Sequence, residues 1–300
     1  MSVERARGAE QGALLAMVLA TLLWGGTFVA IRDIVHDLAP AALVCARFSV
    51  ASLICAVLLA ARRRWPSRAA WGAGALGGVL LVASFTLQAV GLLDTSAGTS
   101  AFLTCAGTLA AAFWAWLLLR QRPGGVLLTG IGVALVGAAL LSLDRTLSIG
   151  RGELVTIVGA LVFPLQIVVV ARFGHRVEPL ELAAVQALTI AVLLVPFSGD
   201  LPTALRGLGS DGWLRFAYLA VAGSTIAPLL QIWAQRSLPP GRIALLFALE
   251  PVFALVVALT LGGERFVPRW WLGAALILSA VVFVESRSAA EASRSRPATA

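Results

Sequence analysis

Charged residues are scarce in this sequence, and lysine is absent altogether, so that all 23 basic residues are arginine. Only 13% of the 300 residues are charged, whereas 59% are hydrophobic. Such a composition leaves too little polar surface to cover a soluble globule of this length. We therefore expect an integral membrane protein without a sizeable soluble domain, and we attribute the absence of lysine to genome composition.

Cysteine and histidine are also rare. Cys45, Cys55 and Cys105 lie within apolar runs, their number is odd, and their spacing matches no disulfide framework or metal motif. His36 and His175 are far apart in the chain, which disfavours a metal site. The sequence has no HExxH motif and no pairing of a nucleophile with a base on adjacent deep helices. We therefore expect no enzymatic activity, no metal and no cofactor.

The formal net charge is +8, but the arginines stand in short loops and tails rather than on a folded polar domain. A nucleic-acid-binding protein would carry a basic face on such a domain. We therefore expect no nucleic-acid partner. The lipid bilayer is the expected partner of these arginines.

Apolar runs long enough to cross a bilayer follow one another along the chain, with short connections between them. A bilayer core about 30 Å thick requires roughly 20 apolar residues per helix. The runs do not alternate between apolar and polar residues, as the strands of a membrane barrel would. The predicted fold is therefore all-α, with ten transmembrane helices at residues 12–32, 40–61, 71–92, 97–119, 125–143, 153–171, 179–198, 213–235, 241–261 and 267–285.

The arginines also predict which side of the membrane each loop faces, because positively charged loops are biased toward the cytoplasm. With the N-terminus inside, the inner segments hold 15 arginines and the outer segments seven, and the remaining one, Arg47, lies within a span. Both termini are therefore expected on the cytoplasmic side of the cell membrane. Residues 1–11 are a cytoplasmic N-terminal segment in this prediction, and residues 286–300 are a disordered cytoplasmic tail. We interpret the first apolar run as a helix rather than a signal peptide.

The two halves of the chain resemble each other. A shift of 143 positions aligns Gly98–Arg122 with Gly241–Arg265 without a gap. The same shift pairs Gln88 with Gln231, a coincidence that shared hydrophobicity does not explain. We therefore predict two repeats, at residues 12–143 and 153–285.

Each predicted repeat contains five helices, an odd number, so the second repeat must enter the membrane with the opposite orientation to the first. Inverted repeats of this kind, related by a pseudo-two-fold axis in the membrane plane, are a recurrent construction of secondary transporters. Two such halves can alternate which side of a central site is open.

Several motifs occur in the same order as in one transporter family. They are LLWGGTFVAIR (Leu22–Arg32), the pair Pro40 and Arg47, TSAGTSAFLT (Thr95–Thr104), WLLLRQR (Trp116–Arg122), LEPVFALVVALTLGGE (Leu249–Glu264) and WLGAALILSAVVFVE (Trp271–Glu285). Across essentially its whole length the chain resembles an EamA-type transporter of the drug/metabolite transporter (DMT) superfamily. The resemblance implies export of small metabolites, amino acids or drug-like amines, often driven by a proton gradient. The chain departs from the family pattern in the fourth helix, where Gly107 and Thr108 stand in place of a proline that would match Pro251.

A carboxylate and a proline stand together inside the predicted ninth helix. Glu250 lies about eight residues from the start of this span, which places it roughly 12 Å deep. An ionised side chain at this depth is costly unless it is paired, hydrated or protonated. Pro251 removes a backbone donor and can distort the helix so that carbonyl groups face a cavity. We interpret Glu250 as a residue that couples transport to protons or substrate, and a structural hydrogen bond to a neighbouring helix is the alternative.

Arg47 is the other deep charge, about 10 Å into the second helix. Its burial would cost on the order of 2.5–3.5 kcal/mol at the bilayer centre, which favours a wet cavity or a partner over lipid. We expect it at the central site, either paired with Glu250 or bound to a substrate carboxylate, for which a guanidinium group is well suited. Extension of the side chain toward the outer interface is the alternative.

Five further side chains are candidates for lining a central cavity: Trp24, Gln88, Gln166, Gln186 and Gln231. Tryptophan can stack on an organic substrate or an ammonium group. The glutamines offer neutral hydrogen-bonding groups, and hydrogen bonds between helices are an equally credible role for them.

These features predict a secondary active transporter of small metabolites that works by alternating access, with efflux coupled to protons. A channel, or a structural or sensor membrane protein without transport coupling, is the alternative. The substrate's identity, the direction of transport and the oligomeric state stay open at this stage.

Overall fold

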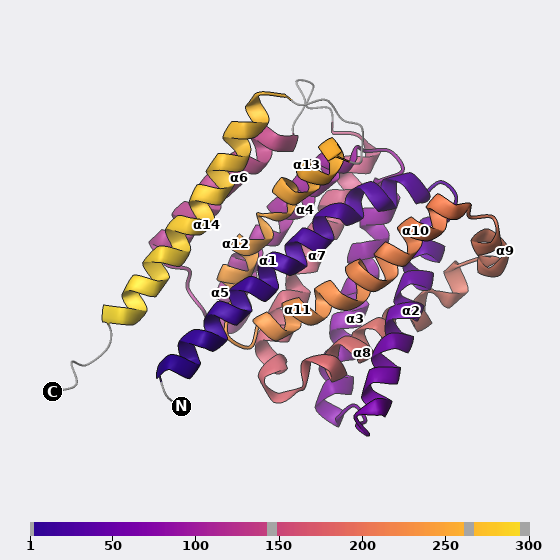
Figure 1. Ribbon diagram of the computed structural model, residues 1–300, viewed down its shortest axis with the longest axis horizontal. Helices are drawn as coiled ribbons and strands as arrows, with labels where there is room; N and C mark the ends of the chain where they lie inside the picture. The colour runs from indigo at the N-terminus through magenta and orange to yellow at the C-terminus, as the bar shows by residue number, and fades with distance from the viewer. Residues whose placement is uncertain (1–2, 143–148, 261–266, 295–300) are drawn as a thin grey trace.

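The computed structural model describes residues 3–142, 149–260 and 267–294, and every regular element in these ranges is a helix (Figure 1). The first half contains α1 (Val3–Ile34), α2 (Pro40–Ala61), α3 (Arg68–Gly91), α4 (Ala97–Leu109), α5 (Ala111–Leu119) and α6 (Gly125–Ser142). The second half contains α7 (Arg151–Phe173), α8 (Pro179–Leu194), α9 (Leu201–Arg206), α10 (Ser210–Tyr218), α11 (Ala227–Ala234), α12 (Pro240–Phe247), α13 (Glu250–Thr260) and α14 (Arg269–Arg294). The 3-10 segments η1 (Gly174–Arg176) and η2 (Val195–Phe197) follow α7 and α8, and a π-helical segment, η3 (Leu219–Ile226), joins α10 to α11.

Nine helical stretches of the described chain are long and apolar enough to cross a membrane. They are residues 8–34, 40–61, 68–91, 97–119, 151–176, 179–197, 210–234, 240–257 and 269–289. α6 is apolar over Gly125–Leu141 but shorter than these, and residues 143–148, which follow it, lie outside the described chain. The protein is therefore a multi-pass membrane protein.

Three of these stretches are interrupted inside the membrane-spanning region. α4 and α5 are separated at Ala110, and α12 and α13 at Ala248 and Leu249. The π-helical segment η3 interrupts a third stretch between Tyr218 and Ala227. Non-helical backbone at membrane depth is tolerated where it is buried in protein or lines a cavity. These three interruptions therefore indicate where a site can form.

Close helix packing depends on glycine at two crossings. α6 and α14 lie side by side at one edge of the bundle (Figure 1). At their crossing a β-carbon added to Gly137 would come within 2.7 Å of the carbonyl oxygen of Gly273, and one added to Gly273 would come within 2.6 Å of the Gly137 oxygen. α1 crosses α13 just as closely, because a β-carbon on Gly25 would lie 2.7 Å from that of Phe253. Small residues allow such backbone approach between membrane helices.

The helices at both ends of the chain are longer than the sequence predicted. α1 begins at Val3 rather than near residue 12, and α14 continues to Arg294 through the first part of the predicted disordered tail. The segment beyond residue 285 is rich in alanine with scattered charges, and these residues favour a helix even without burial. The end of that tail, residues 295–300, lies outside the described chain. So do residues 143–148 and 261–266, which include most of the predicted connections between the fifth and sixth helices and between the ninth and tenth helices.

Candidate functional site

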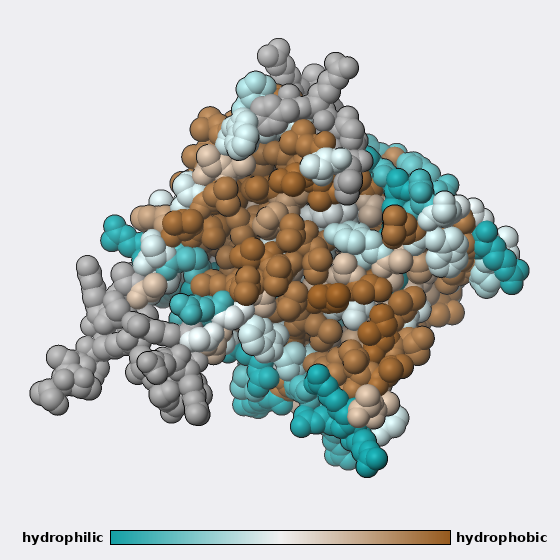
Figure 2. Space-filling view, viewed as in Figure 1, coloured by the Kyte–Doolittle hydropathy of each residue, from teal (hydrophilic) through white to brown (hydrophobic). Residues whose placement is uncertain are grey.

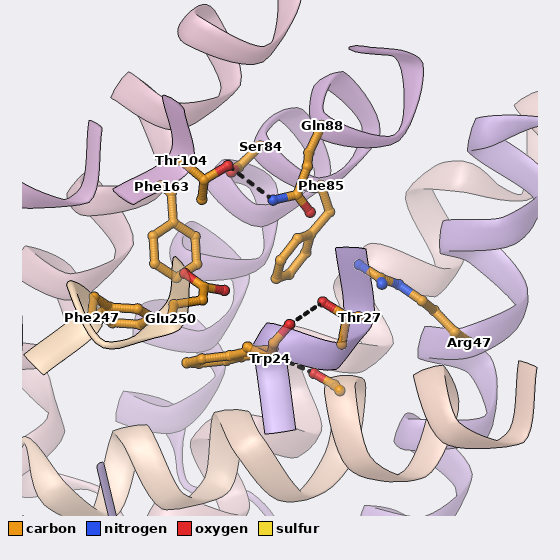
Figure 3. A pocket seen from close by; sticks show the side chains of 11 residues that line it. Trp24, Thr27, Arg47, Ser84, Phe85, Gln88, Thr104, Phe163, Phe247 and Glu250 are labelled. Atoms are coloured by element: carbon orange, nitrogen blue, oxygen red, sulfur yellow. Dashed lines mark hydrogen bonds between the residues drawn. The ribbon is translucent and has the colours of Figure 1, made fainter. Parts of the chain in front are cut away.

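A narrow cavity lies at the centre of the bundle, beside the interruption between α12 and α13 (Figure 3). Side chains or backbone of both halves line it: Trp24, Thr27, Arg47, Ser84, Phe85, Gln88, Thr104, Phe163, Gly223, Phe247 and Glu250. The volume of this cavity is about 20 Å³. This is room for roughly one water molecule. A molecule much larger than water would therefore need the walls of the cavity to separate.

Glu250 is the first residue of α13, and the break before it has a simple local cause. The N–H groups of Ala248 and Leu249 bond to carbonyls three residues earlier, at 3.0 and 3.1 Å, so the last turn of α12 tightens and the helix ends. Pro251 then occupies the first turn of α13, where its missing N–H costs nothing. The sequence predicted a distortion at Pro251, and the structure has the interruption directly before it. A helix N-terminus within the membrane is thereby created, and it favours a carboxylate at this position.

The Glu250 side chain is 5% exposed and lines the central cavity. Within the described chain it has no hydrogen bond and no ion pair. A buried carboxylate without a partner is costly in its charged form. Binding of a proton or of a cationic group would remove that cost.

Arg47 reaches the opposite side of the same cavity from α2 and is 3% exposed (Figure 3). Its guanidinium carbon lies 5.1 Å from the ring centre of Phe48 and 4.9 Å from that of Phe85. These distances are in the range of cation–π contacts, which partly offset the cost of burial. Its Nε has no hydrogen-bond partner in the described structure, and the guanidinium is not within ion-pair distance of Glu250. The two deep charges therefore share a cavity without neutralising each other.

Aromatic rings form the wall next to Glu250. Trp24 stacks on Phe247 with ring centres 5.1 Å apart and an interplanar angle of 18°. Phe163 meets Phe247 edge-on with ring centres 5.4 Å apart, and its ring is tilted by 55° to that of Phe85 at 6.1 Å. An aromatic wall beside a carboxylate is suited to a small organic cation.

The position of Trp24 follows from the π-helical segment. Its indole Nε1 donates a hydrogen bond of 2.9 Å to the carbonyl oxygen of Gly223. In η3 the N–H of Ala227 bonds to the carbonyl oxygen of Ala222, five residues earlier. In the same register, the donor to the Gly223 carbonyl would be the next residue, Pro228. Proline has no N–H to donate. The Gly223 carbonyl is thus left for Trp24, which links α1 to the interrupted stretch of residues 210–234.

The polar part of the cavity wall comes mainly from α3 and α4. Gln88 Nε2 donates to the Thr104 hydroxyl at 3.2 Å, and Ser84 lies one turn away on the same helix. Cys105, which follows Thr104, is fully buried. Sequence reasoning identified Gln88 but missed Ser84, Thr104 and the phenylalanines, because the same residue types are frequent on packing surfaces and lipid-facing surfaces of this chain.

The other predicted cavity glutamines do not line this cavity. Gln231 Nε2 donates to Gln166 at 3.1 Å and to Gln235 at 2.8 Å, and Gln166 donates to Gln186 at 3.4 Å. Gln235 in turn donates to the carbonyl oxygen of Ile167 at 2.8 Å. The structure therefore places Gln166, Gln186 and Gln231 in a buried group that joins α7, α8 and α11. Most of these amide groups bond to one another, but the Nε2 of Gln186 is buried without a hydrogen-bond partner in the described structure.

Comparison with known proteins decides the family. The sequence model of the EamA-like transporter family matches residues 11–143 and, separately, residues 150–286. The chain belongs to this family. The resemblance noted from the motifs is thereby confirmed, and the protein is a membrane transporter rather than an enzyme.

Curated relatives match this chain over most of their length, and two of the three described here are named as transporters. An uncharacterized transporter of Archaeoglobus fulgidus is 27% identical over 91% of this chain and 85% of its own. The uncharacterized inner membrane transporter YedA of Escherichia coli strain K12 is 28% identical over 91% of this chain and 89% of its own. An uncharacterized protein of Pseudomonas aeruginosa is 32% identical over 87% and 90% of the two chains.

A solved crystal structure shares the fold. It aligns with a TM-score of 0.76 at 18% identity and covers 92% of this chain and 97% of its own. This likeness supports the arrangement of the EamA-family helices described above.

Proposed function

We propose that this EamA-family protein is a secondary active transporter that exports small metabolites across the cytoplasmic membrane by alternating access, in exchange for protons. The observation that carries the proposal is the pair of buried charges, Glu250 and Arg47, which line one narrow cavity without an ion pair. Amino acids, amines and drug-like compounds are the expected substrates. Among these, the site best fits a small zwitterion.

The substrate assignment follows from the two sides of the cavity. A carboxylate would meet the guanidinium of Arg47, which presents a fork of donors and has an unused Nε. An ammonium group would meet Glu250 and the ring of Phe247 or Trp24. A substrate with both groups would satisfy both buried charges at once.

Proton exchange follows if a proton and the substrate ammonium compete for Glu250. Facing the cytoplasm, the ionised carboxylate binds the substrate's cationic group. Facing outward, it takes up a proton and the substrate leaves, and the neutral carboxylic acid then crosses back at lower cost. The proton enters the cell as the substrate leaves it.

Helix packing supports the proposal of ten spans in two inverted repeats. α3 packs on α7, and the stretch of α10, η3 and α11, its counterpart in the other half, packs on α1. Likewise α4 packs on α7 and α13 packs on α1, whereas α2 and α6 pack on their own counterparts, α8 and α14. Each of these helix contacts therefore has a counterpart when the two halves are exchanged. The two separate family matches, one to each half, agree with this symmetry. The excess of arginine in alternate loops supports cytoplasmic termini.

Flux through proteoliposomes containing the full chain tests the proposal. A metabolite-release screen first identifies a transported compound, and its labelled form is then used as the probe. We expect saturable uptake that is accelerated by unlabelled substrate on the opposite side and that responds to an imposed pH gradient. Flux that does not saturate and shows no exchange would indicate a channel instead, and absence of flux for every released compound would indicate a structural or sensor role.

A further inference from the structure

A second cavity, larger than the central one, opens between α2 and α8 near the end of α2. Its volume is about 450 Å³. Small and aliphatic residues line it, among them Ser52, Ala56, Ala60 and Leu188. Along α2 the groove extends from Ser52 to Ala60, or about 12 Å. This length is close to the ~15 Å depth of hydrocarbon in one leaflet.

Two tryptophans mark the level of the membrane interface at one end of this groove. Trp65 is 88% exposed and Trp71 is 48% exposed, and both line the groove. Exposed tryptophans on membrane proteins concentrate at the level of the lipid headgroups. The groove therefore runs from the headgroup level into the hydrocarbon, and its apolar part faces acyl chains rather than water.

Arginines surround the same end of the groove. Arg64 lines it and, like Arg62, bonds to the carboxylate of Glu178. Arg63 and Arg68 are exposed, and their side chains form no hydrogen bond or ion pair within the described chain. Figure 2 shows a hydrophilic cluster at the lower end of α2 that borders apolar surface. Two cationic side chains are thus available at headgroup level.

The acidic residues nearby do not cancel this charge. Glu181 is 9% exposed, and its carboxylate accepts a hydrogen bond of 3.0 Å from the N–H of Ser67. With Glu178 it supplies two negative charges against four arginines, at positions 62, 63, 64 and 68. The surplus is positive and lies where a phosphate would be.

We propose that this groove is a binding site for an anionic phospholipid. One acyl chain lies along α2 between Ser52 and Ala60, and the phosphate is bound by Arg63, Arg64 and Arg68. Basic groups at the interface attract anionic lipids, and an apolar groove of leaflet depth selects a lipid over a free anion. The proposal is independent of the transported substrate, because the groove is separate from the central cavity.

Binding of phosphatidylglycerol to the purified, delipidated full chain, measured by native mass spectrometry against phosphatidylcholine with the same acyl chains, tests the proposal. We expect a clear preference for phosphatidylglycerol. Arg63→Gln/Arg68→Gln should weaken its binding about 25-fold, since each arginine near an anionic surface is worth about fivefold. Ala56→Leu should weaken it about 15-fold by displacing roughly two methylene groups from the groove.

Matched variants separate this site from general attraction to the membrane. Arg151→Gln/Arg206→Gln removes the same charge from exposed positions at the other end of the bundle, and Ala275→Leu adds the same volume to the exposed face of α14. Both should bind phosphatidylglycerol as the unaltered protein does. Replacing Arg63 and Arg68 by lysine should retain most of the binding. This result would show that the loss in the glutamine variant comes from the missing charge and not from misfolding.

Two results would overturn the proposal. One is equal binding of the two lipids, or equal loss in the control variants, which would leave only nonspecific attraction. The other is full competition by millimolar inorganic phosphate together with unchanged binding to Ala56→Leu, which would indicate an anion site without an acyl chain.

Discussion

The hydrogen bond from Trp24 to Gly223 makes a prediction that can be worked out from the structure. In Trp24→Phe a ring still packs against Phe247, but the carbonyl oxygen of Gly223 loses its donor. Because Pro228 offers no N–H, the oxygen stays buried and unsatisfied. Leaving a buried polar group without a partner costs about 1–3 kcal/mol. We expect the free energy of unfolding in detergent to fall by that amount, and substrate flux to fall with it.

Trp114→Phe is the matched control, because the indole nitrogen of Trp114 is also buried but has no hydrogen-bond partner in the described structure. That variant removes the same atoms and breaks no hydrogen bond. Its stability should therefore change by less than about 1 kcal/mol.

Pro228→Ala tests the assigned cause. It restores a backbone N–H that can reach the Gly223 carbonyl, so Trp24→Phe should cost clearly less in this background than in the unaltered chain. Equal losses for Trp24→Phe and Trp114→Phe would refute the reasoning. So would a loss in Trp24→Phe that Pro228→Ala leaves unchanged, since the two substitutions act on one acceptor and must couple.

Three further outcomes follow from the packing and the site. Arg47→Ala should weaken transport of carboxylate-bearing substrates by roughly 10- to 100-fold, which corresponds to the loss of a charged hydrogen bond, and should weaken transport of simple amines much less. Equal losses for the two substrate classes in competition assays would argue for a structural role. Gly25→Ala should lower the free energy of unfolding by about 1–3 kcal/mol through overpacking against α13. Gly72 has open space around it, so Gly72→Ala should not have this effect. Thermal melting of the two variants tests the difference. Gln231→Leu removes the central donor of the glutamine group and leaves the Gln166 amide oxygen without its hydrogen bond. The free energy of unfolding should fall by about 0.6 kcal/mol per lost bond, while flux saturates at the same substrate concentration. A shifted half-saturation concentration would show that the group contacts substrate.

Deep charges are the part of the candidate site that the sequence predicted, and both of them line the central cavity. Glu250 and Arg47 stand out because an ionised group within an apolar run is costly and needs a reason. Pro251 indicated the interruption of its helix for a similar reason, since a proline cannot continue a helix without losing a hydrogen bond. Family membership followed from the order of several motifs along the chain.

The remainder of the site depends on contacts between distant parts of the chain. Trp24 and Gly223 are 199 positions apart, and nothing in either local sequence specifies their hydrogen bond. The interruption at Ala110 has no proline or glycine at that position to announce it. Phe247 lines the cavity while Phe113 is 51% exposed, although both lie in similar apolar runs. Hydropathy alone does not separate a cavity wall from a surface that faces lipid.

The glutamines show the same limit from the other side. Gln88 lines the cavity, whereas Gln231, 143 positions later, bonds to other glutamines. A shift of 143 positions pairs them in the sequence, but different residues surround each of them in the structure. The direction of a side chain on a membrane helix depends on which neighbour offers a partner, and that information is not local.

Proton-coupled flux of Glu250→Gln measures the central claim most directly. The variant is reconstituted into proteoliposomes beside the unaltered protein, and both exchange of labelled substrate and accumulation driven by a pH gradient are followed. The amide cannot release a proton, so accumulation should no longer respond to the gradient while the protein still inserts and unfolds normally. A variant whose flux keeps the pH dependence of the unaltered protein would contradict the account.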